Sequence, residues 1–159
     1  MNLVHKIYNS ITKAETIIQM YKSSGKKIVF TNGCFDILHI GHVLYLEEAR
    51  NLGDVLIIGV NDDASISRLK GLHRPINDLK ARLHVLAGLE SVSMVIPFDT
   101  DTPYDLINSI IPNILVKGGD WQPSQIVGSD IVLSNGGEVH SLRFVDGYST
   151  TGIEKKIKG

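Results

Sequence analysis

The stretch Ile28–Leu46, which reads IVFTNGCFDILHIGHVLYL, decides the fold of this chain. Its first three residues are apolar and mostly β-branched, which predicts a buried strand. A tight turn follows, and the residues after His42 predict a helix. A helix N-terminus presents free N–H groups and the positive end of the helix dipole, so it attracts anions. Because His39 and His42 stand at this helix start, the stretch predicts a site for phosphate groups.

The size and composition of the chain are those of an ordinary globular protein. Its 159 residues are 43% hydrophobic and 21% charged, which predicts a single domain over 1–159 with an N-terminal helical extension at 1–25. The formal net charge is −1, which argues against a broad basic face and therefore against a nucleic-acid partner. Cys34 is the one cysteine, so no intramolecular disulfide can form and a reducing compartment fits.

Nothing in the sequence predicts export or a membrane partner. The first ten residues, MNLVHKIYNS, lack the apolar core and small-residue cleavage site of a signal peptide. The longest clean apolar runs, such as Val55–Ile58, are far shorter than a membrane span. The sequence therefore predicts a soluble cytoplasmic protein.

Strand and helix patterns alternate along the rest of the chain. Helices are predicted at 12–24, from His42 to about 51, after 61–62, at 79–89, from 102–103, at 128–135 and after 151, and strands at 27–31, 54–60, 92–97, 114–116 and 138–142. This alternation predicts an α/β fold, a Rossmann-like, doubly wound, five-stranded parallel sheet. The loops after its strands, at 31–42, 61–75, 117–121 and 146–151, should meet at one edge, where such folds bind ligands.

The histidine pair is the strongest chemical signal in the sequence. His39 and His42 are three residues apart, so they share one face of a helical turn. Gly41 between them lets a flat ring or a phosphate approach the backbone. A zinc site is the weaker interpretation, because no third cluster of ligands lies at the usual spacing, although Asp36 could contribute. Cys34 next to these residues is interpreted as a packed turn residue rather than a nucleophile.

Several other loop residues are candidates for binding. Asp36 is either a capping carboxylate or a group that orients a substrate hydroxyl or a metal. The 68–74 loop carries Arg68, Lys70 and Arg74 without compensating acids in the sequence, which favours phosphate binding. The strand end at 117–121 offers a lysine, two glycines that free backbone N–H groups, and Asp120 and Trp121, which could contact a base or sugar. The 149–151 triplet offers hydroxyl and N–H groups at a second helix start.

Two familiar nucleotide motifs are missing from the sequence. There is no G-x-x-x-x-G-K-[ST], so a P-loop is excluded. There is also no G-x-G-x-x-G after the first strand, which argues against a dinucleotide-dependent dehydrogenase.

The signature residues resemble a known superfamily. Gly33-Cys34-Phe35-Asp36 followed by His39-Ile40-Gly41-His42 is similar to the G-x-F-D-x-x-H-x-G-H signature of the cytidylyltransferase-like nucleotidyltransferases, which implies the HxGH nucleotidyltransferase fold. The triplet Ser149-Thr150-Thr151 resembles the late S-T-T motif of that superfamily.

A closer resemblance covers almost the whole chain. The segments 31–43, 68–75, 85–89 and 115–120 resemble the D-glycero-β-D-manno-heptose 1-phosphate adenylyltransferases in their stand-alone form. Two places depart from that pattern: Gly152-Ile153-Glu154 follows S-T-T where apolar residues are more usual, and Trp121 stands where a tyrosine is common. Neither departure removes a catalytic group.

The resemblance implies transfer of AMP from ATP to a heptose 1-phosphate, giving ADP-heptose and pyrophosphate, by direct in-line attack on the α-phosphate. It also implies Mg²⁺ as the cofactor, with no protein side chain expected to ligate it, and a homodimer. The alternatives are a CTP-dependent enzyme for a small alcohol phosphate such as glycerol 3-phosphate, and a non-catalytic nucleotide-binding protein. Whether the product enters lipopolysaccharide or another surface glycan stays open.

The resemblance also implies roles for individual residues. The implied catalytic residues are His39, His42 and Lys70. The implied nucleotide-binding residues are Thr31, Asn32, Gly33, Cys34, Phe35, Gly41, His42, Lys117, Gly119, Asp120, Ser149, Thr150 and Thr151. The implied sugar-phosphate-binding residues are Asp36, Lys70 and Arg74.

Overall fold

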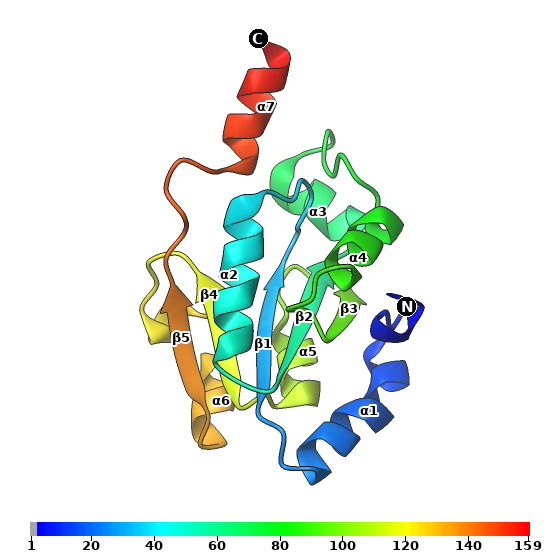
Figure 1. Ribbon diagram of the computed structural model, residues 1–159, viewed down its shortest axis with the longest axis vertical. Coiled ribbons are helices and arrows are strands. Elements are labelled where there is room, and N and C mark those ends of the chain that lie inside the picture. The colour runs from blue at the N-terminus through cyan, green and yellow to red at the C-terminus, as the bar shows by residue number, and fades with distance from the viewer. Residues whose placement is uncertain (1–2) are drawn as a thin grey trace.

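Five parallel strands form the centre of the molecule (Figure 1). In the computed structural model, which describes residues 3–159, the strand order is β3-β2-β1-β4-β5. The strands are β1 (Ile28–Gly33), β2 (Val55–Asn61), β3 (Met94–Phe98), β4 (Ile114–Gly118) and β5 (Glu138–Leu142). All four strand pairings in this sheet are parallel, so the predicted fold class is confirmed.

The helices connect the strands and cover both faces of the sheet. The α-helices are α1 (Ile11–Ser23), α2 (Ile40–Asn51), α3 (Asp63–Lys70), α4 (Leu79–Ala87), α5 (Tyr104–Ile110), α6 (Ser129–Ser134) and α7 (Thr150–Lys158). Two short 3₁₀ helices, η1 (Leu3–Lys6) and η2 (Pro123–Gln125), complete the set. The sequence patterns missed η2 and extended α4 to residue 89, whereas the helix ends at a cap on Gly88.

Two hydrophobic layers hold the sheet between the helices. One layer packs Leu46 of α2 and Leu86 of α4 against the sheet. The other packs α1, α5 and α6 against the opposite face, and α1 contributes Ala14 and Ile18, both essentially fully buried. Because helices cover both faces of the sheet, the strands carry apolar side chains on both faces. The N-terminal helix is therefore packed into the same core as the strands.

The topology changes direction at β1, in the middle of the sheet. The connection through α2 leads from β1 to β2 on one side, and the later connection leads to β4 on the other side. The β1–β4 ladder contains only Val29↔Ile114 and Phe30↔Leu115. Beyond these pairs the two strands separate, which opens a crevice at the carboxyl edge, the place where α/β sheets of this type bind ligands.

The last helix stands apart from the rest of the fold. Figure 1 shows α7, in red, extending away from the carboxyl edge of the sheet to the C-terminus. None of its residues is buried. It therefore contributes its N-terminal end to the carboxyl edge and little to the core.

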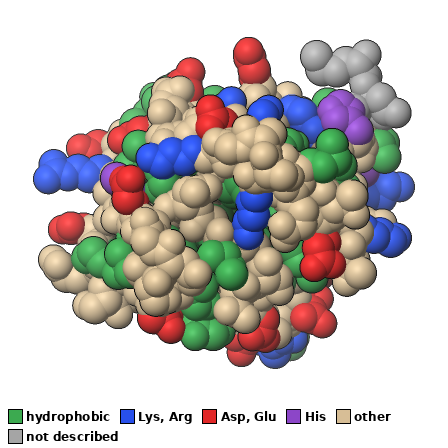
Figure 2. Space-filling model, turned by 90° about the horizontal axis from the view of Figure 1, so that it is seen from below, with side chains coloured by type: hydrophobic (Ala, Val, Ile, Leu, Met, Phe, Trp, Pro, Cys, Tyr) green, Lys and Arg blue, Asp and Glu red, His purple; other side chains and the backbone are tan. Residues whose placement is uncertain are grey.

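The opposite end of the molecule, from which the strands start, has a mixed surface. Figure 2 shows acidic, basic and apolar side chains interspersed on this face. No helix within residues 3–159 combines the length and apolar character needed to cross a bilayer.

Candidate functional site

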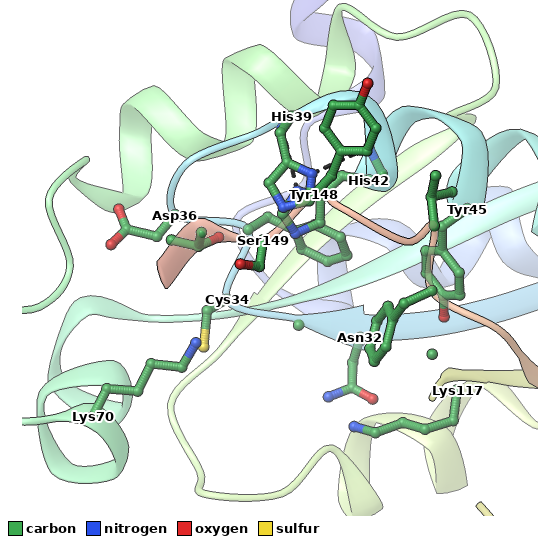
Figure 3. A pocket seen from close by; sticks show the side chains of 17 residues that line it. Asn32, Cys34, Asp36, His39, His42, Tyr45, Lys70, Lys117, Tyr148 and Ser149 are labelled. Carbon is green, nitrogen blue, oxygen red and sulfur yellow. Dashed lines mark hydrogen bonds between the residues drawn. The ribbon is translucent and has the colours of Figure 1, made fainter. Parts of the chain in front are cut away.

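A cavity of about 490 Å³ lies at the carboxyl edge of the sheet, beside the start of α2 (Figure 3). This volume falls within the range of roughly 300–1,000 Å³ that is usual for small-molecule sites. Twelve of the residues predicted from the sequence line it: Asn32, Gly33, Cys34, Phe35, Asp36, His39, Gly41, His42, Lys70, Lys117, Ser149 and Thr150. The fold thus brings four distant segments of the sequence to one place.

The two histidines form the N-terminal cap of α2. The Nδ1 atom of His39 accepts a hydrogen bond from the Gly41 N–H at 3.1 Å, and the Nδ1 atom of His42 accepts one from the His39 N–H at 3.3 Å. An Nδ1 atom that accepts a hydrogen bond carries no proton, so the neutral ring has its proton on Nε2. Both imidazoles therefore have an Nε2–H group left to donate to a ligand in the cavity.

The histidines are held in the neutral form when the cavity contains no anion. Burial, the neighbouring His39 and Lys70 lower the pKa of His42 to about 4. Burial also lowers the pKa of His39. Bringing a polyanion against these rings would favour their charged form and raise both pKa values. Protonation would, however, place a proton on Nδ1 and break the two capping hydrogen bonds, so the rings meet a phosphate chain as neutral Nε2–H donors.

Close packing around the helix start explains two residues of the motif. A Cβ atom on Gly41 would lie 2.9 Å from the His39 ring, so only glycine allows that ring to fold back over the helix end. Phe35, with a positive φ of 48°, lies under His42 at 5.7 Å between ring centroids. A backbone conformation that is rare for a phenylalanine is stabilised here by burial of its ring. The space left by Gly41 and the contact with Phe35 together fix the orientation of the two imidazole rings.

Asp36 is fully engaged by groups of the chain. Its carboxylate accepts hydrogen bonds from the backbone N–H groups of Ile76 and Asn77 and from the Arg74 guanidinium at 2.6 Å. Burial by itself would raise the pKa of Asp36, but the bonds from Asn77, Ile76 and Arg74 outweigh it and lower that pKa. The Asp36 carboxylate thus holds the loop ahead of α4, whose N-terminal cap is Asp78, so the helix-capping alternative is wrong. A contact between Asp36 and a sugar phosphate stays a prediction.

The expectation that the 68–74 segment lacks compensating acids is wrong. Arg68 pairs with Asp101 at 2.9 Å, and Arg74 pairs with both Asp36 and Glu154. These acids come from distant parts of the chain, so the local sequence could not show them. Arg68 and Lys70 also lie in α3 rather than in a loop. Lys70 lines the cavity, and no carboxylate within residues 3–159 forms an ion pair with it.

The glycines at the end of β4 act differently from the prediction. The Gly119 N–H is not free, because it donates to the Leu142 carbonyl at 2.8 Å. A Cβ atom on Gly118 would lie 2.8 Å from the Phe144 ring, and one on Gly119 would lie 2.7 Å from the Trp121 indole nitrogen. The glycine pair therefore admits two aromatic rings. Lys117 lines the cavity, and burial lowers its pKa.

Five of the predicted residues lie outside the cavity lining: Thr31, Arg74, Gly119, Asp120 and Thr151. The Thr31 hydroxyl is fully buried and lies 2.7 Å from the Tyr45 hydroxyl. Tyr45 is itself buried, which raises its pKa to about 12. This pair joins β1 to α2 below the cavity. The contacts of Thr31, Arg74, Gly119, Asp120 and Thr151 with substrate stay predictions.

Three lining residues, Tyr45, Phe144 and Val145, lie outside every segment predicted for the site, whereas Gly118 and Tyr148 fall within the predicted 117–121 and 146–151 loops. Tyr45 follows His42 by three residues on a predicted helix, so helical spacing could have placed it on the same face. Phe144, Val145 and Tyr148 lie in the segment between β5 and α7, which has no periodicity to read. The strand-end position of the 146–151 loop placed Tyr148 at this edge, but nothing in the sequence signalled that Phe144 and Val145 also line the cavity.

Arg82, which is only 1% exposed, holds the backbone next to the cavity in place. Its guanidinium donates to the carbonyl oxygens of Cys34 and Asn61 and pairs with Asp63 at 2.7 Å. These contacts tie together the carboxyl ends of β1 and β2. A buried arginine needs such partners, because an unpaired charge in the interior is costly.

Taken together, the lining suits a chain of phosphates. It offers imidazole and lysine donors and the start of α7, where Ser149 caps the helix by accepting from the Gly152 N–H at 2.9 Å. These groups donate hydrogen bonds or carry positive charge, which matches phosphate oxygens. The site can therefore hold a triphosphate and stabilise charge that develops on it.

Comparisons with known proteins agree with this geometry. Residues 30–153 match the family model described as cytidylyltransferase-like. Two curated relatives are the bifunctional protein HldE of Actinobacillus pleuropneumoniae serotype 5b, 61% identical over 141 residues, and that of Histophilus somni, 57% identical over 147 residues. The matches cover 89% and 92% of this chain but only 30% and 31% of the relatives, so the chain spans about a third of their length.

Solved structures show the same fold. The lipopolysaccharide core biosynthesis protein from Thermoplasma volcanium is 30% identical, with a TM-score of 0.63 over 79% of this chain and 100% of that one. Pantoate-beta-alanine ligase from Francisella tularensis, at 16% identity and a TM-score of 0.62, shares the fold alone over 96% of this chain and 76% of its own. On the match over most of its length and the shared fold, this chain belongs to the cytidylyltransferase-like family of nucleotidyltransferases.

Proposed function

We propose that this chain transfers AMP from ATP to D-glycero-β-D-manno-heptose 1-phosphate, giving ADP-heptose and pyrophosphate. The observation that carries the proposal is the cavity shared by the His39–His42 cap of α2 and the Ser149 cap of α7. Two helix N-termini and two Nε2–H donors facing one cavity suit the three phosphates of a nucleotide. The identity with the HldE proteins supports heptose as the acceptor class.

The reaction requires positioning and charge stabilisation more than a protein nucleophile. An oxygen of the acceptor phosphate attacks the α-phosphorus of ATP, and the bond from that phosphorus to the bridging oxygen of the β-phosphate breaks in line. Negative charge grows on the departing pyrophosphate. His39 and His42 donate to its oxygens, and Lys70 lies where it can approach the same phosphates. Donors held in place before the reaction cost no reorganisation as the charge develops.

The lining residues also fit the implied Mg²⁺ as an ion that arrives with the nucleotide. The groups around the cavity are mainly nitrogen donors and hydroxyls, and the nearby Asp36 carboxylate is already occupied. Within residues 3–159 no group of three or more His, Cys, Asp or Glu residues is arranged to hold a metal. Mg²⁺ commonly keeps water and phosphate oxygens as ligands, and when bound it neutralises phosphate charge and orients the triphosphate.

A substrate panel tests the proposal directly. The protein is incubated with Mg²⁺, ATP or CTP, and heptose 1-phosphate, glycerol 3-phosphate or mannose 1-phosphate, and pyrophosphate release is followed. We expect release with ATP and heptose 1-phosphate. Preferred release with CTP and glycerol 3-phosphate would replace the proposed substrates with those of a cytidylyltransferase for a small alcohol phosphate. Nucleotide binding without release in any combination would show a non-catalytic protein.

We also propose that the protein works as a homodimer in the cytoplasm, on the basis of the resemblance stated above. Light scattering coupled to size-exclusion chromatography tests the first part, because a homodimer has twice the mass of the 17.5 kDa chain. A single species at the mass of one chain, across the concentrations used for activity, would contradict it.

A further inference from the structure

A second, smaller cavity opens at the same edge of the sheet. Its volume is about 220 Å³, below the roughly 300–1,000 Å³ usual for larger ligands, so it suits a molecule smaller than a nucleotide. It lies on the side of the sheet covered by α5 and η2, whereas the first cavity lies beside α2. The two cavities share two lining residues, Asn32 and Lys117, and therefore meet there.

The meeting point is the crevice between β1 and β4. The register of the ladder pairs Phe30 with Leu115, and the same register extended by two residues would place Asn32 opposite Lys117. The strands have separated at that level, so these two side chains lie in the opening rather than in a continuous ladder. Figure 3 shows their polar ends close together, away from the histidine pair. A molecule in the second cavity can therefore approach the first past this pair.

The two ends of the second cavity differ in charge. Lys117 stands at the shared end, and no carboxylate within residues 3–159 forms an ion pair with it. Asp101 stands in the lining contributed by the β3–α5 connection, beside Thr102. A phosphate group is attracted to Lys117, which is unpaired within the described residues, whereas the charge of Asp101 is already compensated by Arg68, so a phosphorylated ligand has one favoured direction in this cavity. Its phosphate points toward the first cavity and its uncharged end toward Asp101.

The rest of the lining suits an uncharged, hydroxyl-rich group. Thr102, Asp101 and Gln125 can exchange hydrogen bonds with sugar hydroxyls, while Trp121 and Val127 offer apolar surface for the carbon-bound hydrogens of a ring. Several of these groups are already held in place. Arg68 binds Asp101, and the Trp121 indole N–H donates to the Gly118 carbonyl at 3.0 Å. Groups that are fixed beforehand lose less entropy on binding.

We propose that the second cavity binds the sugar part of the acceptor, and that Asn32 and Lys117 hold its phosphate at the passage between the cavities. This inference rests on the proposed function. It places the attacking oxygen beside the crevice, facing an α-phosphate whose leaving pyrophosphate lies toward His39 and His42. That arrangement is the one an in-line displacement requires. It assigns the acceptor to Lys117, Thr102 and Trp121 rather than to Asp36 and Arg74.

Two variants with matched controls test the assignment. Val127→Phe fills the second cavity, and its control Val85→Phe adds the same bulk at an exposed position on α4. Thr102→Val removes the hydroxyl, and its control Thr12→Val makes the same change on the exposed side of α1. We expect each cavity variant to raise the acceptor KM by about tenfold or more, with the ATP KM changed less than about twofold. The controls should match the unmodified protein.

An increase in the ATP KM without one in the acceptor KM would assign the cavity to the nucleotide and overturn the proposal. An unchanged acceptor KM in both variants would overturn it as well. Thermal melts of all four variants identify any general loss of folding, and a cavity variant that fails to fold is replaced by Val127→Leu, a smaller filling change.

A binding measurement separates this inference from the proposed function. If the unmodified protein releases no pyrophosphate with any acceptor, the proposed function fails, and calorimetric titration with heptose 1-phosphate in the presence of a non-hydrolysable ATP analogue still tests the cavity. Binding that is lost in Val127→Phe and kept in Val85→Phe supports the assignment. Binding that survives in Val127→Phe, or no binding to the unmodified protein at millimolar ligand, refutes it.

Discussion

Two helices present their N-termini to the same cavity, and they are held in place by different means. The helix α2 has Tyr45, Leu46 and Ala49 buried in the core, so its start is fixed by hydrophobic packing. The helix α7 has no buried residue. Of the ion pairs within the described residues, the one that reaches α7 joins Glu154 to Arg74 at 2.7 Å, and Arg74 is anchored in turn by Asp36.

The site therefore has a firm half, formed by the start of α2, and a loosely held half, formed by the start of α7. Burial of large apolar side chains stabilises α2 by roughly 1.5–3 kcal/mol for each, whereas partly exposed ion pairs contribute far less. Elements with few buried contacts open most easily, and helices and loops that close over ligands are drawn from them. We therefore expect α2 to stabilise the reacting charge and α7 to adjust as the nucleotide binds.

The largest effect is expected from removing a donor of the firm half. His42→Ala should lower kcat by about 100- to 1,000-fold, as losses of preorganised stabilising donors do. His84→Ala is the control, because His84 is an exposed histidine on α4 outside the cavity. Steady-state pyrophosphate release measures the effect, and circular dichroism checks folding. A folded His42→Ala variant with normal turnover would remove His42 from the mechanism.

A smaller effect is expected from Lys70, at the end of α3. Lys70→Ala should lower kcat by about 10- to 100-fold and weaken ATP binding much less, because an exposed lysine contacts the phosphates mainly in the reacting complex. Single-turnover rates and ATP titrations of the same variant separate the two quantities. Lys80→Ala on α4 is the matched control. Equal losses in binding and in rate would show that Lys70 acts already in the ground state.

The loosely held half is tested by its ion pair. Glu154→Gln keeps the shape of the side chain but removes the charge that Arg74 contacts. An interaction of about 1 kcal/mol corresponds to roughly fivefold, so the ATP KM should rise by about that factor. The melting temperature should stay unchanged, because α7 buries nothing. Glu15→Gln on α1 serves as the control, and a lowered melting temperature would show that α7 is part of the stable core after all.

The last effect is on stability rather than on rate or binding, and it concerns pH and the half-buried imidazole of His42 on α2. The pKa of His42 is about 4 in the folded protein and near 6.5 in an unfolded chain. Between these values the unfolded state binds more protons, so the free energy of unfolding should fall as the pH drops from about 6.5 to about 4. Urea unfolding curves across this range measure the slope. His42→Ala should flatten it and His84→Ala should not; the same slope in both variants would contradict the origin in His42.

The sequence supported the fold better than it supported the contacts of the site. Alternating strands and helices predicted the parallel sheet, and the turn before His42 predicted a helix start with two imidazoles, because both are properties of short stretches of chain. The partners of Arg68 and Arg74 could not be predicted in this way. Arg68 pairs with Asp101, which lies 33 residues further along the chain, and Arg74 pairs with Asp36 and Glu154, which are also distant in the sequence. Only folding brings these residues together.

The glycines after β4 make the same point. Their sequence suggested free N–H groups, but the structure uses the Gly119 N–H in a bond to Leu142 and uses the missing side chains to admit Phe144 and Trp121. The sequence placed the 146–151 loop at this edge but could not show that Phe144 and Tyr148 line the cavity, because an irregular segment has no period that reveals which side chains face inward.

By itself, the sequence determined the order of strands and helices, the anion-attracting helix start and the chemical groups available there, since periodicity, capping and charge are local properties. The tertiary structure decided which cations are paired, which strands separate to open a crevice, and which segment forms the far wall of the cavity. The physical reason is that these depend on contacts between residues distant in the chain, whose geometry is set by packing of the whole core.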